Sequence, residues 1–130
     1  MVRFASHSEE IRAVAARTLE HCPYHSGRRI DISTGATSLT QALILAAGGA
    51  IRAGRGWACE PAEPAARENL HEVARTLLAE AGVPVSPQAC PSRALARWER
   101  AVADPPLIYR LVGAHLAASH HLRIPQPVAA

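Results

Sequence analysis

The sequence has no lysine and few aromatic side chains. These shortages limit the possible composition of its charged surface and of its hydrophobic core. All 14 basic residues are arginine, which fits either a GC-rich genome or selection for bidentate binding of anions. Aromatic residues make up only 4% of the chain and hydrophobic residues 48%, so the core has to be built from alanine, leucine, valine and isoleucine. Such small side chains favour closely packed helices.

Strong charge and long apolar runs are missing as well. The net charge of +3 permits an acidic partner but falls short of the basic footprint of a strong nucleic-acid binder. The segment from Ile32 to Ile51 is uncharged, but its serine and threonine residues predict a buried helix rather than a membrane span. The first residues lack the apolar stretch of a secretory signal, and three cysteines, an odd number, indicate free thiols in a reducing compartment. We therefore expect a soluble, cytoplasmic protein without a membrane partner.

Helical periodicity recurs five times along the chain. The clearest helix starts at Pro64, which suits a first turn, and stops before Gly82. Leu77 lies in the middle of its apolar stripe. Ser92 and Asp104 are the predicted caps of the two helices that follow. The predicted helices cover approximately residues 8–20, 38–53, 64–81, 93–102 and 105–121.

The helix predicted at 38–53 is apolar on nearly every face. Such a helix belongs at the centre of a core or in a subunit interface. Gly48 and Gly49 each cost about 1 kcal/mol against alanine, which is tolerable if another helix crosses closely there. The excess of apolar surface predicts a homodimer.

The predicted fold is therefore mainly α: a compact bundle of four or five helices in a single domain over residues 1–122. A loose C-terminal tail is expected over residues 123–130, where two prolines interrupt the chain. Arg3-Phe4 and the segment Ile30–Ile32 are short extended stretches that could pair as a minor two-stranded ribbon near the N-terminal half.

Cysteine and histidine occur together at one place. Cys22 and His25 have the C-x2-H spacing that can chelate zinc, and Cys90 is a candidate further ligand. The same Cys22 and His25 could serve as nucleophile and base of a small enzyme. Neither set is complete, so no metal, cofactor or catalytic residue is predicted, and Cys22, His25 and Cys90 stand as the alternative.

A long polar loop precedes the apolar helix and carries Arg28 and Arg29. A helix start offers free N–H groups and a positive dipole end, which suit an anion. The P-loop lysine and glycine spacing are absent, so this is no nucleotide motif of that kind. The residues predicted to bind an anionic ligand or partner are Arg28, Arg29, Ser33, Thr34, Thr37 and Ser38.

Three further arginines, Arg93, Arg97 and Arg100, recur at helical spacing and predict a basic helix face. Such a face could contact nucleic-acid phosphates or an acidic protein. Because no catalytic set is complete, the favoured function is a non-enzymatic binding or regulatory module for an acidic protein or an anionic small molecule. The alternatives are a cysteine- and histidine-centred enzyme or metal protein and a nucleic-acid binder.

Overall fold

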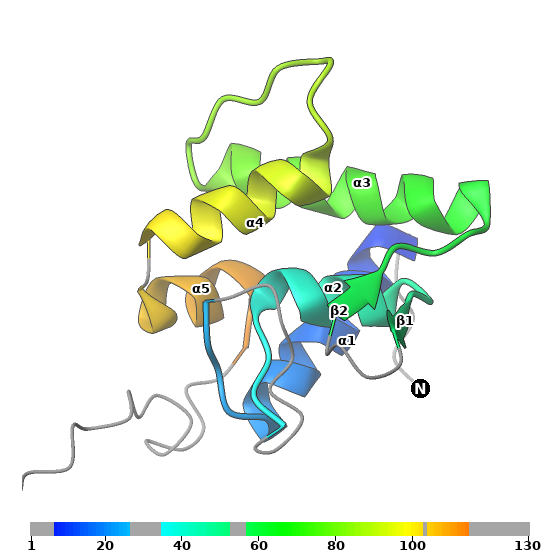
Figure 1. Cartoon of the computed structure of the whole chain (residues 1–130). Helices are drawn as coiled ribbons and strands as arrows, with labels where there is room; N and C mark the ends of the chain where they lie inside the picture. Colours follow the sequence, from blue (N-terminus) through cyan, green and yellow to red (C-terminus); the bar gives the residue numbers. More distant parts are fainter. Residues whose placement is uncertain (1–6, 27–34, 53–56, 103, 115–130) are drawn as a thin grey trace, which may run out of the picture.

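The computed structural model describes residues 7–26, 35–52, 57–102 and 104–114 (Figure 1). Within these ranges the fold is mainly helical with a small two-stranded antiparallel sheet, which confirms the predicted fold class, but the sheet is formed by residues 50–52 and 57–59 and not by the stretches for which pairing was predicted. The structure does not describe residues 3–4 and 30–32, which were predicted to pair as a ribbon, or the predicted tail over residues 123–130. The elements, in chain order, are α1 (His7–His21), α2 (Leu39–Ala46), β1 (Ala50–Arg52), β2 (Trp57–Cys59), α3 (Pro64–Glu80), α4 (Pro91–Val102) and α5 (Pro105–Val112).

Helix starts and ends follow the sequence signals in most places. Pro64 occupies the first turn of α3, and the side chain of Asp104 caps α5 by accepting a hydrogen bond from the N–H of Leu107 at 3.4 Å. The α5 helix ends at Val112, well before the predicted end at residues 120–121, because Gly113 adopts a left-handed conformation with φ of 82°. The sequence therefore placed the starts of these helices better than it placed the end of α5.

The apolar helix is much shorter than predicted. The α2 helix ends at Ala46, and Gly48 turns the chain at a φ of 100° into strand β1. Gly49 has no room for a side chain, because a Cβ there would collide with the carbonyl oxygens of Cys59 and Ile44. The close neighbour at Gly49 from outside α2 is thus strand β2, a Cβ at Gly48 would meet nothing within 4 Å, and the prediction of a crossing helix was wrong.

The small sheet lies directly after α2 and beside it (Figure 1). Strands β1 and β2 pair in antiparallel register, with Ala50 opposite Cys59 and Arg52 opposite Trp57. The side-chain oxygen of Gln41 on α2 accepts a hydrogen bond from the N–H of Ala58 at 2.9 Å. This hydrogen bond connects β2 to α2 and so helps to position the residues that follow β2.

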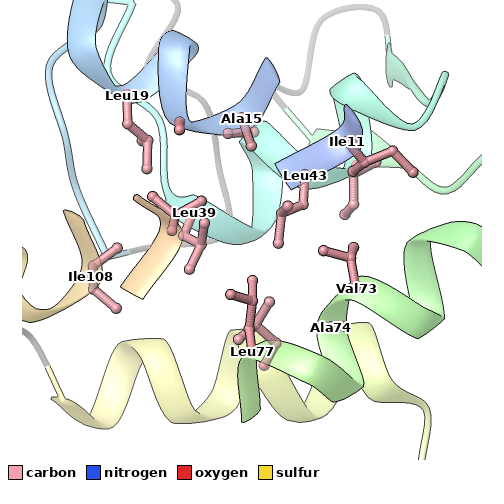
Figure 2. Packing of buried hydrophobic residues seen from close by; sticks show 14 of the residues in the cluster. Ile11, Ala15, Leu19, Leu39, Leu43, Val73, Ala74, Leu77 and Ile108 are labelled. Atoms are coloured by element: carbon pink, nitrogen blue, oxygen red, sulfur yellow. The ribbon is translucent and has the colours of Figure 1, made fainter. Parts of the chain in front are cut away.

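The core is built around α2, whose leucines lie between α1 and α3 (Figure 2). Leu39 and Leu43 are fully buried, as are Leu19 of α1 and Leu77 of α3. Ile108 of α5 packs into the same cluster. The prediction of the apolar helix at the centre of the core is confirmed, and the core is mainly aliphatic but also contains the fully buried Tyr109.

Helices α3 and α4 run in the same general direction, because the segment between them carries the chain back along α3 (Figure 1). A regular bundle with alternating helix directions would have placed Cys59 and Cys90 at opposite ends. The structure instead brings both cysteines to the wall of one cavity. The return of the chain between α3 and α4 is the reason.

No helix in the described ranges has both the length and the hydropathy needed to cross a membrane. The apolar surface that suggested a homodimer is largely used inside the domain, because α2 buries Leu39, Ala42, Leu43 and Ile44. Among the described residues, the large hydrophobic side chains that are exposed are Val14 (44%) and Ile51 (48%). The covered α2 therefore supplies little surface for a partner.

Leu77→Ala should lower the free energy of unfolding by about 2–5 kcal/mol, because Leu77 is completely buried between α2 and α3. Chemical denaturation of the wild type and the variant measures the difference. Thr76→Ala, at an exposed position on the same helix, should change it by less than about 0.5 kcal/mol. A loss below about 1 kcal/mol for Leu77→Ala would contradict the assigned packing.

Candidate functional site

The predicted anion loop is described only at its C-terminal end. Arg28, Arg29, Ser33 and Thr34 lie outside the described residues, so their role stays a prediction. Thr37 is buried, and its N–H donates to the carbonyl of Pro23 at 2.8 Å. Ser38, also in the predicted set, is the N-cap of α2, and its hydroxyl accepts from the N–H of Gln41 at 3.2 Å.

The N-terminus of α2 does bind an anion, but the anion belongs to the chain itself. The carboxylate of Glu99 on α4 accepts hydrogen bonds from the N–H of Leu39 at 2.7 Å and of Thr40 at 3.0 Å. The Thr40 hydroxyl donates at 2.8 Å, and the Tyr24 hydroxyl at 2.6 Å. The expectation that these N–H groups are free for a ligand was wrong, because the internal carboxylate already satisfies them.

Glu99 is almost completely inaccessible, with 1% of its surface exposed. Burial raises the pKa of its carboxyl above the ordinary value, and the hydrogen bonds from Tyr24, Leu39 and Thr40 counteract part of that rise. Sequence reasoning missed this residue. The available signal was its spacing, because Glu99 lies four residues after Leu95 and three after Ala96, on the buried stripe of α4.

Cys22 and His25 lie at the end of α1 and just after it, and both are half-buried. The N–H of His25 donates to the carbonyl of Thr37 at 3.0 Å, which holds the start of the polar loop against its end. Within the described residues, the groups close enough to share a metal do not include Cys22 or His25. Cys90 is therefore not brought together with this pair.

Cys90 instead belongs to a polar cluster that the sequence did not predict. Glu60 follows β2, His71 lies on α3, and Ser92 is in the first turn of α4. The Nε2 atom of His71 lies 2.9 Å from Oε1 of Glu60, and the Ser92 hydroxyl donates to Oε2. The Cys90 thiol lies 3.8 Å from the same Oε2 and 3.3 Å from the Ser92 hydroxyl.

Ser92 was predicted to cap α4, but the helix already begins at Pro91. Its hydroxyl points to Glu60 and ties the start of α4 to the end of β2. Burial alone would raise the pKa of Glu60, but the hydrogen bonds from Ser92 and His71 and the charge of His71 together lower it. Glu60 is thus held as a carboxylate, which makes it a weak base at neutral pH.

The order of groups in this cluster does not match nucleophilic catalysis of the cysteine–histidine kind. Such a site needs the imidazole next to the sulfur and a carboxylate behind the imidazole. Here the Glu60 carboxylate lies between His71 and Cys90. One potential metal-ligating atom of each of the three residues lies within 4.8 Å of the other two.

A cavity of about 800 Å³ opens beside this cluster. Its walls come from α2, from the end of β2 and from α4. The three arginines predicted as a basic face, all exposed, line it together. The lining residues are Thr40, Gln41, Ile44, Ala58, Cys59, Glu60, Cys90, Ser92, Arg93, Ala96, Arg97 and Arg100.

A second cavity of about 500 Å³ lies between α1 and the end of α5. It is lined by charges of both signs, including Glu9, Glu20 and Arg17. Arg12 in its wall is committed to the fold, because its guanidinium binds Glu80 at 2.7 Å and the carbonyl of Leu111 at 2.5 Å. This cavity has no clear preference for an anion or a cation.

Glu99→Ala should lower the free energy of unfolding by about 2–5 kcal/mol, because buried donors on Leu39, Thr40 and Tyr24 lose their acceptor. Glu99→Gln keeps one acceptor oxygen and should lose less. Arg100→Ala, on the next and exposed position of α4, is the control and should change stability by less than about 0.5 kcal/mol. Denaturant titration measures all three, and equal losses for Glu99→Ala and Arg100→Ala would contradict the capping role.

No family model, curated protein or solved structure matches this chain. Its function therefore has to be inferred from its own residues and their geometry.

Proposed function

We propose that the protein is a binding module for a small anionic molecule, which it holds in the cavity beside α4. The observation that carries the proposal is the wall of three exposed arginines, Arg93, Arg97 and Arg100, on that cavity. Their spacing of four and three residues places the guanidinium groups on one face of the helix. Guanidinium groups bind carboxylate and phosphate oxygens in a bidentate manner.

These arginines are available for a ligand. Within the described residues, none of the ion pairs involves Arg93, Arg97 or Arg100. Three positive charges that face one cavity repel each other modestly, and an anion between them relieves the repulsion. The wall is thus better suited to an anionic ligand than to an uncharged one.

The other polar groups on the cavity wall are already committed within the chain. The Thr40 hydroxyl donates to Glu99, and the Gln41 side-chain oxygen accepts from Ala58. The Glu60 carboxylate accepts from His71 and Ser92. The arginines are therefore the groups that would set the charge preference of the ligand.

The size of the cavity favours a small molecule over a macromolecule. A volume of about 800 Å³ falls within the range of about 300–1,000 Å³ that is usual for small-ligand pockets. A nucleic acid or an acidic protein would contact a broader convex face and would not need a recess. The homodimer expected from the apolar helix stays a separate prediction, and the proposed site lies within one chain.

Citrate and pyrophosphate are suitable first probes, because each presents several anionic groups. We expect either probe to raise the melting temperature of the wild type, since a ligand that binds the native state stabilises it. Arg97→Gln should weaken binding by about 10–100-fold, the equivalent of one charge-assisted hydrogen-bonded contact of about 1.5–3 kcal/mol. Isothermal titration calorimetry measures the affinity.

Arg110→Gln is the matched control, because Arg110 is exposed on α5 and does not line the cavity. It should leave the affinity within about twofold, as expected for a distant surface charge. The double variant Arg28→Ala, Arg29→Ala tests the polar loop in the same assay. If the loop double variant loses binding and Arg97→Gln keeps it, the ligand site is the loop and not the cavity. Equal loss in Arg97→Gln and Arg110→Gln, or tight binding of DNA in place of both probes, would refute the proposal.

A further inference from the structure

Three different metal-ligating groups from three separate parts of the chain meet beside the cavity, and two of them, Glu60 and Cys90, line it. Glu60 comes from the segment after β2, His71 from α3 and Cys90 from the position before α4. One ligand atom of each lies within 4.8 Å of the others. All three residues are half-buried, so the point between them is sheltered yet reachable.

Two of the three separations between the ligand groups are close to those in a tetrahedral zinc site. Zinc bonds of about 2.0–2.3 Å to oxygen, nitrogen and sulfur imply ligand atoms about 3.3–3.6 Å apart. Here Nε2 of His71 is 2.9 Å from Glu60 Oε1, and Sγ of Cys90 is 3.8 Å from Glu60 Oε2. The ligand atoms of all three residues lie within 4.8 Å of one another, so changes in side-chain rotation would be needed to bring them to one metal ion.

We propose that Glu60, His71 and Cys90 bind a zinc ion, with the fourth coordination position open to the cavity. Thiolate, imidazole and carboxylate are the three ligand types that zinc takes in proteins. A purely oxygen-seeking ion such as Mg²⁺ or Ca²⁺ would not favour the sulfur and the imidazole. One thiolate and one carboxylate also balance the two positive charges of the ion.

The surroundings support the ligand atoms in the way that metal sites require. Ser92 donates to Oε2 of Glu60 and lies 3.3 Å from the Cys90 sulfur, so it orients two ligands at once. His71 is carried on the long helix α3, next to the fully buried Leu70. Two helices thus position the ligands: α3 carries His71, and Ser92 in the first turn of α4 contacts Glu60 and Cys90.

Three protein ligands leave one position for water or for a group of the bound molecule. Glu60 and Cys90 both line the cavity, so that position faces the space beside the arginines. The metal proposal does not depend on the anion proposal, because metal binding can be measured with no organic ligand present. The two can therefore fail separately.

The test is titration of the reduced, metal-free full chain with Co²⁺ and then Zn²⁺. We expect one ion per chain, a thiolate-to-cobalt charge-transfer band in the near ultraviolet, and loss of that band when Zn²⁺ displaces Co²⁺. Cys90→Ser should abolish the band, and His71→Gln should weaken metal affinity at least about 100-fold. Even partners outside the ligand shell cost about 10–100-fold, which is the expected loss for Ser92→Ala.

Cys22→Ser is the matched control, because Cys22 is a free thiol outside the group of clustered ligands. It should keep both the band and the affinity of the wild type. Circular dichroism and a Zn²⁺-dependent rise in melting temperature show whether each variant is folded and still binds. A wild type that gives no thiolate band and no thermal shift with Zn²⁺ refutes the site. So does a band that survives Cys90→Ser and disappears in Cys22→Ser, which would move the metal to the Cys22–His25 pair.

Discussion

The buried carboxylate of Glu99 is the interaction on which the rest of this structure depends. It joins α4 to the N-terminus of α2 through the N–H groups of Leu39 and Thr40. It also receives the hydroxyl of Tyr24, whose ring packs edge-on against Tyr109 at 6.0 Å between centroids. The Tyr109 hydroxyl donates in turn to the carbonyl of Leu19 on α1 at 2.8 Å. Hydrogen bonds and one aromatic ring contact therefore connect α4, α2, α5 and α1 within a mainly aliphatic core.

This constraint also fixes how α4 is rotated. Glu99 and Ser92 lie seven residues apart, nearly two turns, and both are buried and hydrogen-bonded to other elements. With that side of α4 turned inward, the neighbouring face carries Arg93, Arg97 and Arg100 to the cavity. The position of the three arginines thus follows from the burial of Glu99, which lies between Arg97 and Arg100 in the sequence.

At the N-terminus of α2, a side chain from another part of the fold binds the N–H groups that could otherwise bind an external anion. A helix start attracts anions because its first N–H groups and its dipole point outward. Here the carboxyl group of Glu99 from the same chain occupies that place and accepts hydrogen bonds from the N–H groups of Leu39 and Thr40. Among the described residues, the arginines of α4 that line the cavity take part in none of the ion pairs, and this is why the proposed anion site lies there and not at the start of α2.

Local signals in the sequence determined the helices themselves. The proline at the start of α3, the aspartate before α5 and the spacing of aliphatic residues each act over a few positions, and the structure follows them. The same periodicity placed three arginines on one face of α4. These features depend on neighbours along the chain, so the sequence is enough to predict them.

The contacts that make the sites were decided only by the tertiary structure. Glu60, His71 and Cys90 are separated by 10 or more residues and meet because the chain returns along α3 before α4 begins. The early end of α2 depends on β2, whose backbone leaves room for glycine alone at position 49. From the sequence, Glu99 is expected to be a surface charge on an arginine-rich helix. Its buried role is evident only from its hydrogen-bond donors on Tyr24, Leu39 and Thr40. The packed fold decides which residues distant in the sequence come into contact. Local sequence patterns do not predict the path of the segment between α3 and α4, on which these contacts depend.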